Sequence, residues 1–224
     1  MNCIVTAGPT FEPLDDVRRL TNFSTGRLGT ELANFLAANG HQVTLLIGES
    51  ATWTGERRAQ SVKTFSSTSD LRAKLKALSR KKVDAIFHAS AVSDFGFGKV
   101  FAETKPGEFT ALKASKKIST RQGAMLVELL PTPKIIAELR GWFPKTLIVG
   151  WKFEANGGRA DALRAARKQI ADCSTDACVA NGPAYGKGFS LVSNKGGRHL
   201  APAEKLFSAL EALLRTSGGK ICGT

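Results

Sequence analysis

The chain has 224 residues, of which 42% are hydrophobic and 23% charged, and its formal net charge is +13. This composition is ordinary for a globular domain, and no apolar run approaches the roughly 18 residues that a membrane-spanning helix needs. Because the N-terminus also lacks the basic and apolar segments of a secretory signal, the sequence predicts a cytoplasmic protein whose positive charge favours anionic partners.

Strands and helices are predicted to alternate along the chain, the strands as short apolar runs and the helices with apolar residues at helical spacing. Strands are expected at 2–6, 41–48, 61–65, 83–92, 125–130, 146–153 and 176–181, followed by an antiparallel hairpin at 189–200. Helices are expected at 25–40, 68–82, 132–143, 158–172 and 202–217. This order predicts an α/β fold with a doubly wound, mostly parallel, Rossmann-like sheet in a single domain, 1–224.

One segment shows no strong periodicity. Residues 95–124 contain only two acidic residues, Glu103 and Glu108, and the basic residues Lys99, Lys105, Lys113, Lys116, Lys117 and Arg121. A long irregular insertion in a compact domain is more often functional than accidental, so we predict a basic flap at about 95–124. The alternative is a solvated, disordered loop.

Four polar segments follow predicted strands, where an open parallel sheet binds its ligands. They lie at 7–29, 90–95, 131–134 and 180–188. The first is far longer than the usual connection of about 2–6 residues. It contains neither a dinucleotide-binding glycine fingerprint nor a Walker A sequence. Its end, "STGRLG", opens a helix with the hydroxyls of Ser24 and Thr25 and the cation of Arg27, which is typical of an anion site.

The cysteines and histidines do not indicate a metal centre. Cys3, Cys173, Cys178 and Cys222 form no CxxC pair and none has metal-ligand spacing with a histidine. We interpret them as reduced thiols. The three histidines are scattered, so neither a histidine-based triad nor a zinc site is predicted, and His88 is interpreted as a core residue. The metal ligands, if any, are unknown at this stage.

Six segments together resemble one family. "TAGPTFEPLDDVRRLTNFSTGRLG" resembles the opening motif of phosphopantothenoylcysteine synthetases, and "SAVSDF" is similar to a second motif of that family. "KKIST", "LVELLPTPKII", "VGWKFEA" and "DACVAN" are similar to further motifs, in the same order. The resemblance covers about residues 3–195.

The resemblance implies a reaction. Enzymes of this family join 4′-phosphopantothenate to cysteine in coenzyme A biosynthesis. CTP or ATP activates the carboxylate as an acyl-nucleotidylate, pyrophosphate leaves, and the cysteine amine displaces the nucleotide with the help of Mg2+. The resemblance also implies a homodimer and no flavin, and a decarboxylase could be a separate partner. "NFSTGR" and "SAVSDF" favour the ATP-using type and "LDDVR" the CTP-using type, so the nucleotide stays open.

The resemblance also assigns roles to residues. Asn22 would hold the acyl group, Arg18 would place the carboxylate, and the flap lysine Lys117, with Lys113 and Lys116 as alternatives, would cover the triphosphate. Gly8, Thr10, Ser24, Thr25, Gly26 and Arg27 would hold phosphates. The other nucleotide-binding residues would be Ala91, Val92, Asp94, Lys116, Pro133, Lys134, Ile135, Ile136, Trp151, Arg164 and Lys168. Trp151 stands where the family usually has phenylalanine, and Arg164 and Lys168 stand for two lysines.

Three alternatives remain at the level of sequence. A relative of the same fold could act on another carboxylate. A nicotinamide-dependent reductase would need a Tyr-xxx-Lys pair, but the only tyrosine, Tyr185, is followed by Gly186 and Lys187. A nucleic-acid-binding module would need basic and aromatic residues on one surface, and much of the positive charge lies instead in the flap and the amphipathic helices, so this function is not expected.

Overall fold

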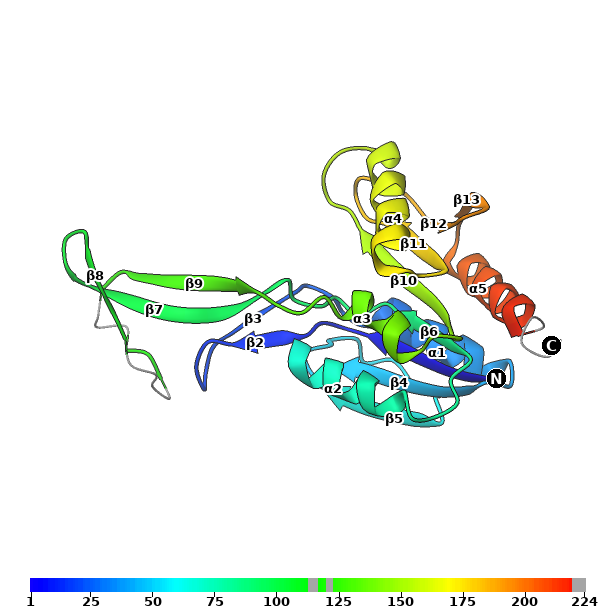
Figure 1. Ribbon diagram of the computed structural model, residues 1–224, viewed down its shortest axis with the longest axis horizontal. Helices are drawn as coiled ribbons and strands as arrows, with labels where there is room; N and C mark the ends of the chain where they lie inside the picture. Colours follow the sequence, from blue (N-terminus) through cyan, green and yellow to red (C-terminus); the bar gives the residue numbers. More distant parts are fainter. Residues whose placement is uncertain (113–116, 120–122, 219–224) are drawn as a thin grey trace.

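The computed structural model describes residues 1–112, 117–119 and 123–218 (Figure 1). Its strands are β1 (Asn2–Ala7), β2 (Phe11–Pro13), β3 (Arg19–Thr21), β4 (Gln42–Gly48), β5 (Ser61–Phe65), β6 (Ala85–His88), β7 (Phe95–Lys105), β8 (Glu108–Ala111), β9 (Met125–Pro131), β10 (Leu147–Phe153), β11 (Ala177–Asn181), β12 (Phe189–Ser193) and β13 (Gly196–Leu200). Its helices are α1 (Arg27–Ala38), α2 (Thr68–Leu78), α3 (Ile135–Trp142), α4 (Arg159–Cys173) and α5 (Ala203–Gly218). The predicted strands and helices are present, and their ends differ from expectation by a few residues.

One large sheet has the strand order β13-β12-β11-β10-β6-β1-β4-β5. The strands from β11 to β5 in this order are parallel, whereas β12 and β13 are antiparallel. This confirms the prediction of a doubly wound, mostly parallel sheet with a C-terminal antiparallel hairpin. β1 lies between β4 and β6, so the chain adds strands first on one side of β1 and then on the other. Ligands bind beyond the carboxyl ends of the strands at such a switch point.

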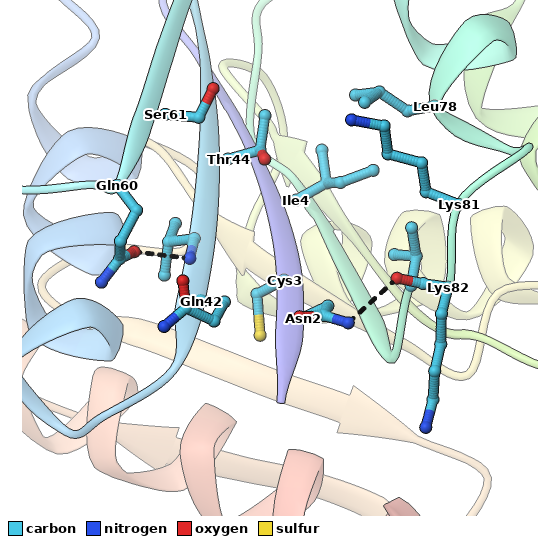
Figure 2. Close-up of a pocket in the computed structure, with 12 residues that line it drawn as sticks. Asn2, Cys3, Ile4, Gln42, Thr44, Gln60, Ser61, Leu78, Lys81 and Lys82 are labelled. Carbon is cyan, nitrogen blue, oxygen red and sulfur yellow. Dashed lines mark hydrogen bonds between the residues drawn. The ribbon is translucent and has the colours of Figure 1, made fainter.

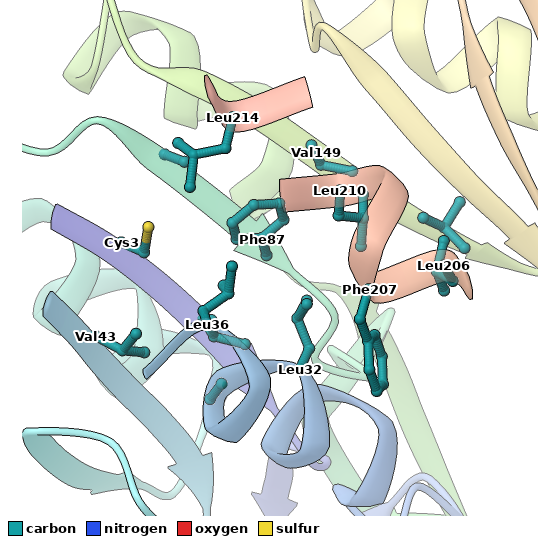
Figure 3. Close-up of a cluster of buried hydrophobic side chains, with 14 of the residues drawn as sticks. Cys3, Leu32, Leu36, Val43, Phe87, Val149, Leu206, Phe207, Leu210 and Leu214 are labelled. Carbon is teal, nitrogen blue, oxygen red and sulfur yellow. The ribbon is translucent and has the colours of Figure 1, made fainter. Parts of the chain in front are cut away.

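Helices cover both faces of the sheet because successive residues of each strand point to opposite faces. Cys3 and Val5 of β1 pack in a cluster with α1 and α5, whereas Ile4 packs with α2 and α3. Figure 3 shows the first cluster, in which Leu32 of α1 and Leu210 of α5 pack on the same face of the sheet. Burying a side chain of this size contributes roughly 1.5–3 kcal/mol. Among the described helices none is long and apolar enough to cross a membrane.

A long arm projects from the domain and consists of an antiparallel sheet in the order β8-β7-β9 (Figure 1). The sequence predicted an irregular flap here, and that prediction is wrong for 95–105 and 108–111, which are strands. The predicted strand at 125–130 belongs to this arm and not to the main sheet. The register of β7 against β9 shifts between Phe97 and Val100, which breaks the alternation that would have indicated a strand.

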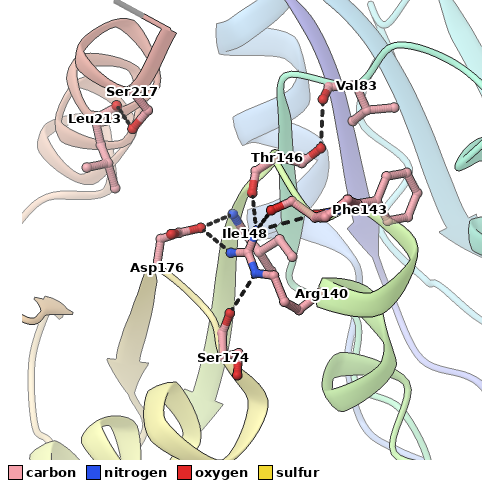
Figure 4. Close-up of polar contacts among 10 residues, drawn as sticks. Val83, Arg140, Phe143, Thr146, Ile148, Ser174, Asp176, Leu213 and Ser217 are labelled. Atoms are coloured by element: carbon pink, nitrogen blue, oxygen red, sulfur yellow. Dashed lines mark hydrogen bonds and ion pairs between the residues drawn. The ribbon is translucent and has the colours of Figure 1, made fainter. Parts of the chain in front are cut away.

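Arg140 in α3 joins the amino ends of β10 and β11 to two helices (Figure 4). Its guanidinium donates to the backbone oxygens of Ser174 at 3.0 Å and Thr146 at 2.9 Å, and to the carboxylate of Asp176 at 2.7 Å. The same Asp176 oxygen accepts from the backbone N–H of Ile148 at 2.7 Å. The Arg140 side chain therefore donates to carbonyl oxygens just before β10 and at the end of α4. It holds the start of β10 beside the start of β11.

Replacing Arg140 with methionine should destabilise the domain while keeping most of the aliphatic stem. Because several carbonyls and the Asp176 carboxylate would lose their donor, we expect the free energy of unfolding to fall by about 2–4 kcal/mol. Urea denaturation followed by tryptophan fluorescence would measure this. Arg167→Met is the matched control, because Arg167 is exposed on α4 and forms no ion pair in the described structure. Equal losses in both variants would contradict this account.

Candidate functional site

Two loops meet at the switch point of the sheet, one after β1 and one after β6. The backbone N–H of Thr10 donates to the oxygen of Ala91 at 3.1 Å, and the N–H of Ala91 donates to the oxygen of Gly8 at 3.0 Å. Pro9 and Ala91 form a parallel bridge. The backbone N–H of Ser93 donates to the hydroxyl of Thr10 at 2.8 Å. The two loops therefore extend β1 and β6 past the sheet as one paired unit.

Two glycines allow the first loop to fold back against β4. Gly8 has a φ of 76° and Gly26 a φ of 80°, which other residues rarely adopt. A Cβ on Gly8 would lie 2.9 Å from the Cβ of Ala51, and a Cβ on Gly26 would lie 2.9 Å from Cδ1 of Ile47. Larger residues would push the start of α1 away from the end of β1. The loop needs glycine at both positions.

Asn22 contacts the second loop directly. Its Nδ2 donates to the oxygens of Ala91 at 3.1 Å and Val92 at 3.2 Å. Its Oδ1 has no hydrogen-bond partner among the described residues. Asn22 thus lies beside Ala91 and Val92, and both of its N–H donors are occupied by the backbone. A ligand would meet the amide oxygen first.

The start of α1 presents backbone N–H groups at the same edge. Gly26 is its N-cap and supplies no side-chain hydrogen bond. The hydroxyl of Thr25 accepts only a long bond, 3.3 Å, from the N–H of Arg27. Ser24 is half-buried beside it. A helix N-terminus of this kind attracts anions. Arg27 itself points along the helix to Glu31, with Nε 2.7 Å from the carboxylate.

Burial keeps three of the residues that the resemblance assigned to the nucleotide or its phosphates away from solvent, namely Thr10, Ile135 and Ile136. Thr10 is inaccessible to solvent, so its hydroxyl joins the loops and is not exposed to a ligand. Ile135 and Ile136 are buried in the core beneath α2 and α3, so their side chains do not line an open surface. Pro133 and Lys134 are exposed.

The turn is joined to the second loop, and this brings Asp94 to the same edge. The backbone N–H of Thr132 donates to the oxygen of Asp94 at 3.0 Å, and its hydroxyl donates to the oxygen of Ser93. The carboxylate of Asp94 is exposed, and no described residue pairs with it. An unpartnered carboxylate therefore stands beside the paired loops.

The ends of β10 and β11 complete this edge of the sheet. Trp151 is half-buried against the α1 and α5 cluster, and its buried indole Nε1 has no hydrogen-bond partner among the residues that the structure describes. Phe153 ends β10 with 64% of its surface exposed. Asn181 ends β11, and its buried Oδ1 accepts no hydrogen bond from the described part of the chain. The sequence reasoning did not select Phe153 or Asn181, although both lie inside segments that it matched to the family.

Arg164 and Lys168 lie apart from these loops. Both belong to the middle of α4 and pair with carboxylates of their own helix, Arg164 with Asp161 and Lys168 with Asp172 at 3.0 Å. Their side chains are 73% and 76% exposed. The structure therefore does not bring them to the switch point.

Arg18 lies at the turn between β2 and β3, where the hairpin contacts the arm. Its Nη2 donates to the backbone oxygen of Ile118 at 2.7 Å, and Asp15 Oδ2 accepts from the N–H of Ile118 at 3.1 Å. Ile118 is 6% exposed. Lys117 directly precedes Ile118 in the chain, so its backbone lies close to the Arg18 side chain. Lys113 and Lys116, the alternative flap lysines, fall outside the described residues.

The hydrogen bond from the Ile118 N–H, with further backbone N–H groups and the Arg18 guanidinium, lowers the pKa of Asp15. The Asp15 side chain is inaccessible to solvent.

His88 is also buried, and burial lowers its pKa to about 4. Its Nδ1 lies 2.9 Å from the hydroxyl of Thr6. His88 is therefore neutral near pH 7 and belongs to the core, as its position after an apolar run predicted.

No three His, Cys, Asp or Glu side chains of the described segments are grouped as metal ligands. A metal ion can also take oxygen ligands from a bound substrate. Mg2+ is commonly bound in this way, through one or two carboxylates and the phosphates of a nucleotide. The exposed carboxylate of Asp94 is the side chain here that fits such an ion.

Comparisons with known proteins place the chain in a family. Residues 1–197 match the family described as DNA/pantothenate metabolism flavoprotein C-terminal domain. The coenzyme A biosynthesis bifunctional protein CoaBC of Thermococcus kodakarensis is 34% identical over 178 residues, which cover 80% of this chain and 40% of that protein. The chain belongs to this family, which confirms the resemblance to phosphopantothenoylcysteine synthetases. It spans less than half the length of that curated relative.

Two solved structures share the fold. The DNA/pantothenate metabolism flavoprotein from Streptococcus pneumoniae superposes with a TM-score of 0.82 at 24% identity, covering 96% of this chain and 99% of that one. A Cab2 mutant in complex with phosphopantothenate-cysteine gives a TM-score of 0.76 at 18% identity, covering 99% of this chain and 89% of that one. At these identities the likeness concerns the fold.

Asp15→Asn should release the arm from the hairpin. The carboxylate has a lowered pKa in the folded chain, so its contribution is present above its ordinary pKa and is lost as the pH falls through the folded value. The uncharged amide should behave at pH 7 as the wild type does at acid pH. Hydrogen-exchange mass spectrometry should show protection at 117–119 reduced about tenfold or more. Asp16→Asn, at the exposed neighbour, should change nothing, and equal protection in all three proteins would refute the contact.

Proposed function

We propose that the chain is an amide-forming ligase that joins 4′-phosphopantothenate to cysteine. A nucleoside triphosphate, ATP or CTP, forms an acyl-nucleotidylate with the carboxylate and loses pyrophosphate. The cysteine amine then attacks the acyl carbon, the nucleoside monophosphate leaves, and a proton is released. The product would pass to a decarboxylase, the separate partner that the proposal implies. The observation that carries this proposal is the meeting of Asn22 and the opening loop with Ala91 and Val92 at the switch point.

The electrostatics of this edge suit two anionic substrates. The N-terminal amides of α1, with Ser24 and Thr25 beside them, are available to phosphate oxygens. In the proposal, Asn22 holds the acyl group next to this anion site. Its donors would have to exchange the oxygens of Ala91 and Val92 for the acyl oxygen, where they would stabilise the charge that develops during attack. Family membership and the net charge of +13 support these roles.

The remaining roles belong to the other ends of the strands and to the arm. The unpartnered indole Nε1 of Trp151 and amide oxygen of Asn181 are groups that a nucleotide could satisfy. Mg2+, when bound, would neutralise part of the phosphate charge, and Asp94 is the residue that would hold it together with those phosphates. Lys117, carried by the arm, would stabilise charge on the departing pyrophosphate.

Pyrophosphate release tests the proposal. Purified protein with Mg2+, cysteine and either ATP or CTP should release pyrophosphate only when 4′-phosphopantothenate is present, and the faster nucleotide identifies the natural one. Asn22→Ala should lower kcat about 10²–10³-fold, the usual cost of one lost charge-stabilising donor. Lys117→Ala should slow release and Lys117→Arg should restore part of it.

The controls separate a local effect from general damage. Asn39→Ala, at the C-cap of α1, and Lys105→Ala, at the turn between β7 and β8, should leave kcat unchanged. If pyrophosphate appears with another carboxylate and not with 4′-phosphopantothenate, the fold and the site stand but the substrate is wrong. Release that is insensitive to Asn22→Ala would show that this residue has no part in the reaction.

We also propose that the chain forms a homodimer through its arm. Leu126, Leu129 and Leu130 of β9 are 53%, 48% and 48% exposed, and Phe95 and Phe109 on the neighbouring strands are 45% and 36% exposed. By the register of the arm, Leu126, Leu130 and Phe109 lie on one of its faces, and Leu129 and Phe95 lie on the other. Exposed apolar side chains grouped far from a core commonly mark an interface. A second copy whose arm grips both faces would cover them, which is consistent with the dimer that the family implies.

Light scattering measures the mass of the particle in solution against the 23.9 kDa chain. Leu129→Glu should convert a dimer into a monomer, because a buried unpaired charge costs several kcal/mol. Val62→Glu makes the same change on the edge strand β5, where Val62 is 40% exposed, and should leave the dimer intact. A monomeric wild type, or a dimer lost only in Val62→Glu, would refute the arm as the contact.

A further inference from the structure

The polar side chains at the amino edge of the sheet point away from one another. Around a pocket of about 320 Å³ at the start of β1, β4 and β5, the ends of Lys81 and Lys82 lie in opposite directions (Figure 2). At the same edge the carboxylate of Asp84 accepts from the N–H of Asn2 at 2.7 Å and adds negative charge. These groups do not converge on one ligand, whereas the polar groups around Tyr185 converge on one oxygen atom.

Tyr185, the only tyrosine of the chain, lies in the loop after β11 and is 3% exposed. Its ring packs in a small cluster with Ala162 and Ala166 of α4 and Val192 of β12. The loop therefore begins at the carboxyl edge of the sheet and places Tyr185 on the face that α4 covers. The proposed ligase reaction gives this residue no role.

Three segments meet at the hydroxyl of Tyr185. Nη2 of Arg159, at the start of α4, donates to it at 2.8 Å, and Nδ1 of His199 in β13 lies 2.9 Å from it. The hydroxyl itself donates to the backbone oxygen of Phe189, the first residue of β12, at 3.2 Å. A hydroxyl has one proton and two lone pairs, so all three contacts are satisfied together when His199 carries a proton on Nδ1.

Ring contacts add to these hydrogen bonds. The guanidinium of Arg159 lies 4.6 Å from the centroid of the Tyr185 ring, and the His199 ring stacks on Tyr185 with 5.9 Å between centroids. Gly188 makes room for this stack, because a Cβ there would lie 2.8 Å from Cε1 of His199. Moving Tyr185 out of this place would break a cation–π contact, a ring stack and the hydrogen bonds together.

The same loop is tied to the end of β10. The backbone N–H of Ala184 donates to the oxygen of Glu154 at 3.0 Å, and the N–H of Glu154 donates to the oxygen of Asn181 at 2.9 Å. Gly182 lies directly against Glu154, since a Cβ there would be 2.5 Å from the Glu154 oxygen. The N–H of Tyr185 donates to the oxygen of Gly182 at 3.1 Å. Asn181 and Tyr185 therefore stand at the two ends of one hydrogen-bonded turn.

The side chains of Asn181 and Tyr185 lie on opposite faces of the sheet. Val179 packs with α1 and α5, so Asn181, two residues further along β11, points to the same face. Ala180 and Tyr185 pack together on the α4 face. The backbone of the turn is therefore the link between Tyr185 and the side chain of Asn181.

We propose that Tyr185 is a positioning residue for the nucleotide end of the candidate site. By fixing the turn from the α4 face, it holds Asn181, whose buried Oδ1 has no partner in the described structure, on the same face as Trp151. The inference rests on the proposed function, in which a nucleotide satisfies that oxygen. Because a hydrogen bond weakens steeply with misalignment, loss of this anchor weakens nucleotide binding and leaves the chemistry at the acyl group unchanged.

Tyr185→Phe removes the hydroxyl and keeps the ring. We expect the KM for the nucleotide to rise about five- to tenfold and kcat to stay within about twofold, because the change affects binding alone. The KM for 4′-phosphopantothenate should not change. Arg159→Met should raise the nucleotide KM in the same way and add nothing in the double variant, because both changes break the same contact. Arg198→Met, at an exposed neighbour of His199, should have no effect.

A second measurement does not depend on turnover. Because Tyr185 is the only tyrosine, 3-fluorotyrosine incorporated throughout the chain gives a single fluorine resonance in nuclear magnetic resonance. Coupling between two sites is reciprocal, so saturating ATP or CTP should shift that resonance. Inorganic phosphate, which lacks a base and a ribose, should not shift it, and Asn181→Ala should abolish the shift.

The outcomes separate this role from the proposed function. An unchanged nucleotide KM in Tyr185→Phe, or an equal rise in both KM values, would overturn the role of Tyr185 and leave the ligase function standing. So would a fluorine resonance that does not respond to a nucleotide which the wild type turns over. If the wild type releases no pyrophosphate, the proposed function fails, and the fluorine resonance alone decides whether a nucleotide acts on this turn.

Discussion

The hydroxyl of Thr10 holds the candidate site together. It is inaccessible to solvent and accepts from the N–H of Ser93, so separating the two loops would leave a buried donor without a partner, at a cost of about 1–3 kcal/mol. The other parts of the site are bonded to these same loops. Thr21, at the base of the hairpin, donates to the oxygen of Thr10, and Thr132 donates to the oxygen of Ser93. Asn22 is positioned by the same pair of loops.

The fold could be predicted from the sequence because its core uses simple local patterns. Parallel strands that are buried on both faces are continuous apolar runs, and the helices that cover them show apolar residues at helical spacing. The place of the site followed from the alternation of strands and helices, which sets all the carboxyl ends at one edge. Gly8, Gly26 and Asn22 lie at this edge, and the roles that the resemblance assigns to them stay predictions.

The remaining features depend on relations that a local pattern does not contain. The bulge in β7 hides a strand, and its partner β9 comes after a long stretch of intervening chain. The direction of a side chain decides whether a residue of a matched motif can meet a ligand. Thr10 and Ile135 flank the site, but their side chains are buried. Arg164 stands for a lysine that the resemblance implies, but on α4 it pairs with Asp161 of its own helix.

The arm also bears on how the domain can fold and vary. The entropy lost on joining two strands grows with the length of free chain between them. The first and last residues of the arm, Phe95 and Pro131, pair with each other, so the arm closes its own ends. Once the arm has formed, the entropy lost on closing the connection from β6 to α3 is that of a short turn. Insertions and deletions at the far end of the arm therefore leave the pairing of β6 with β10 unaffected, and the reach of the arm can change without cost to the sheet.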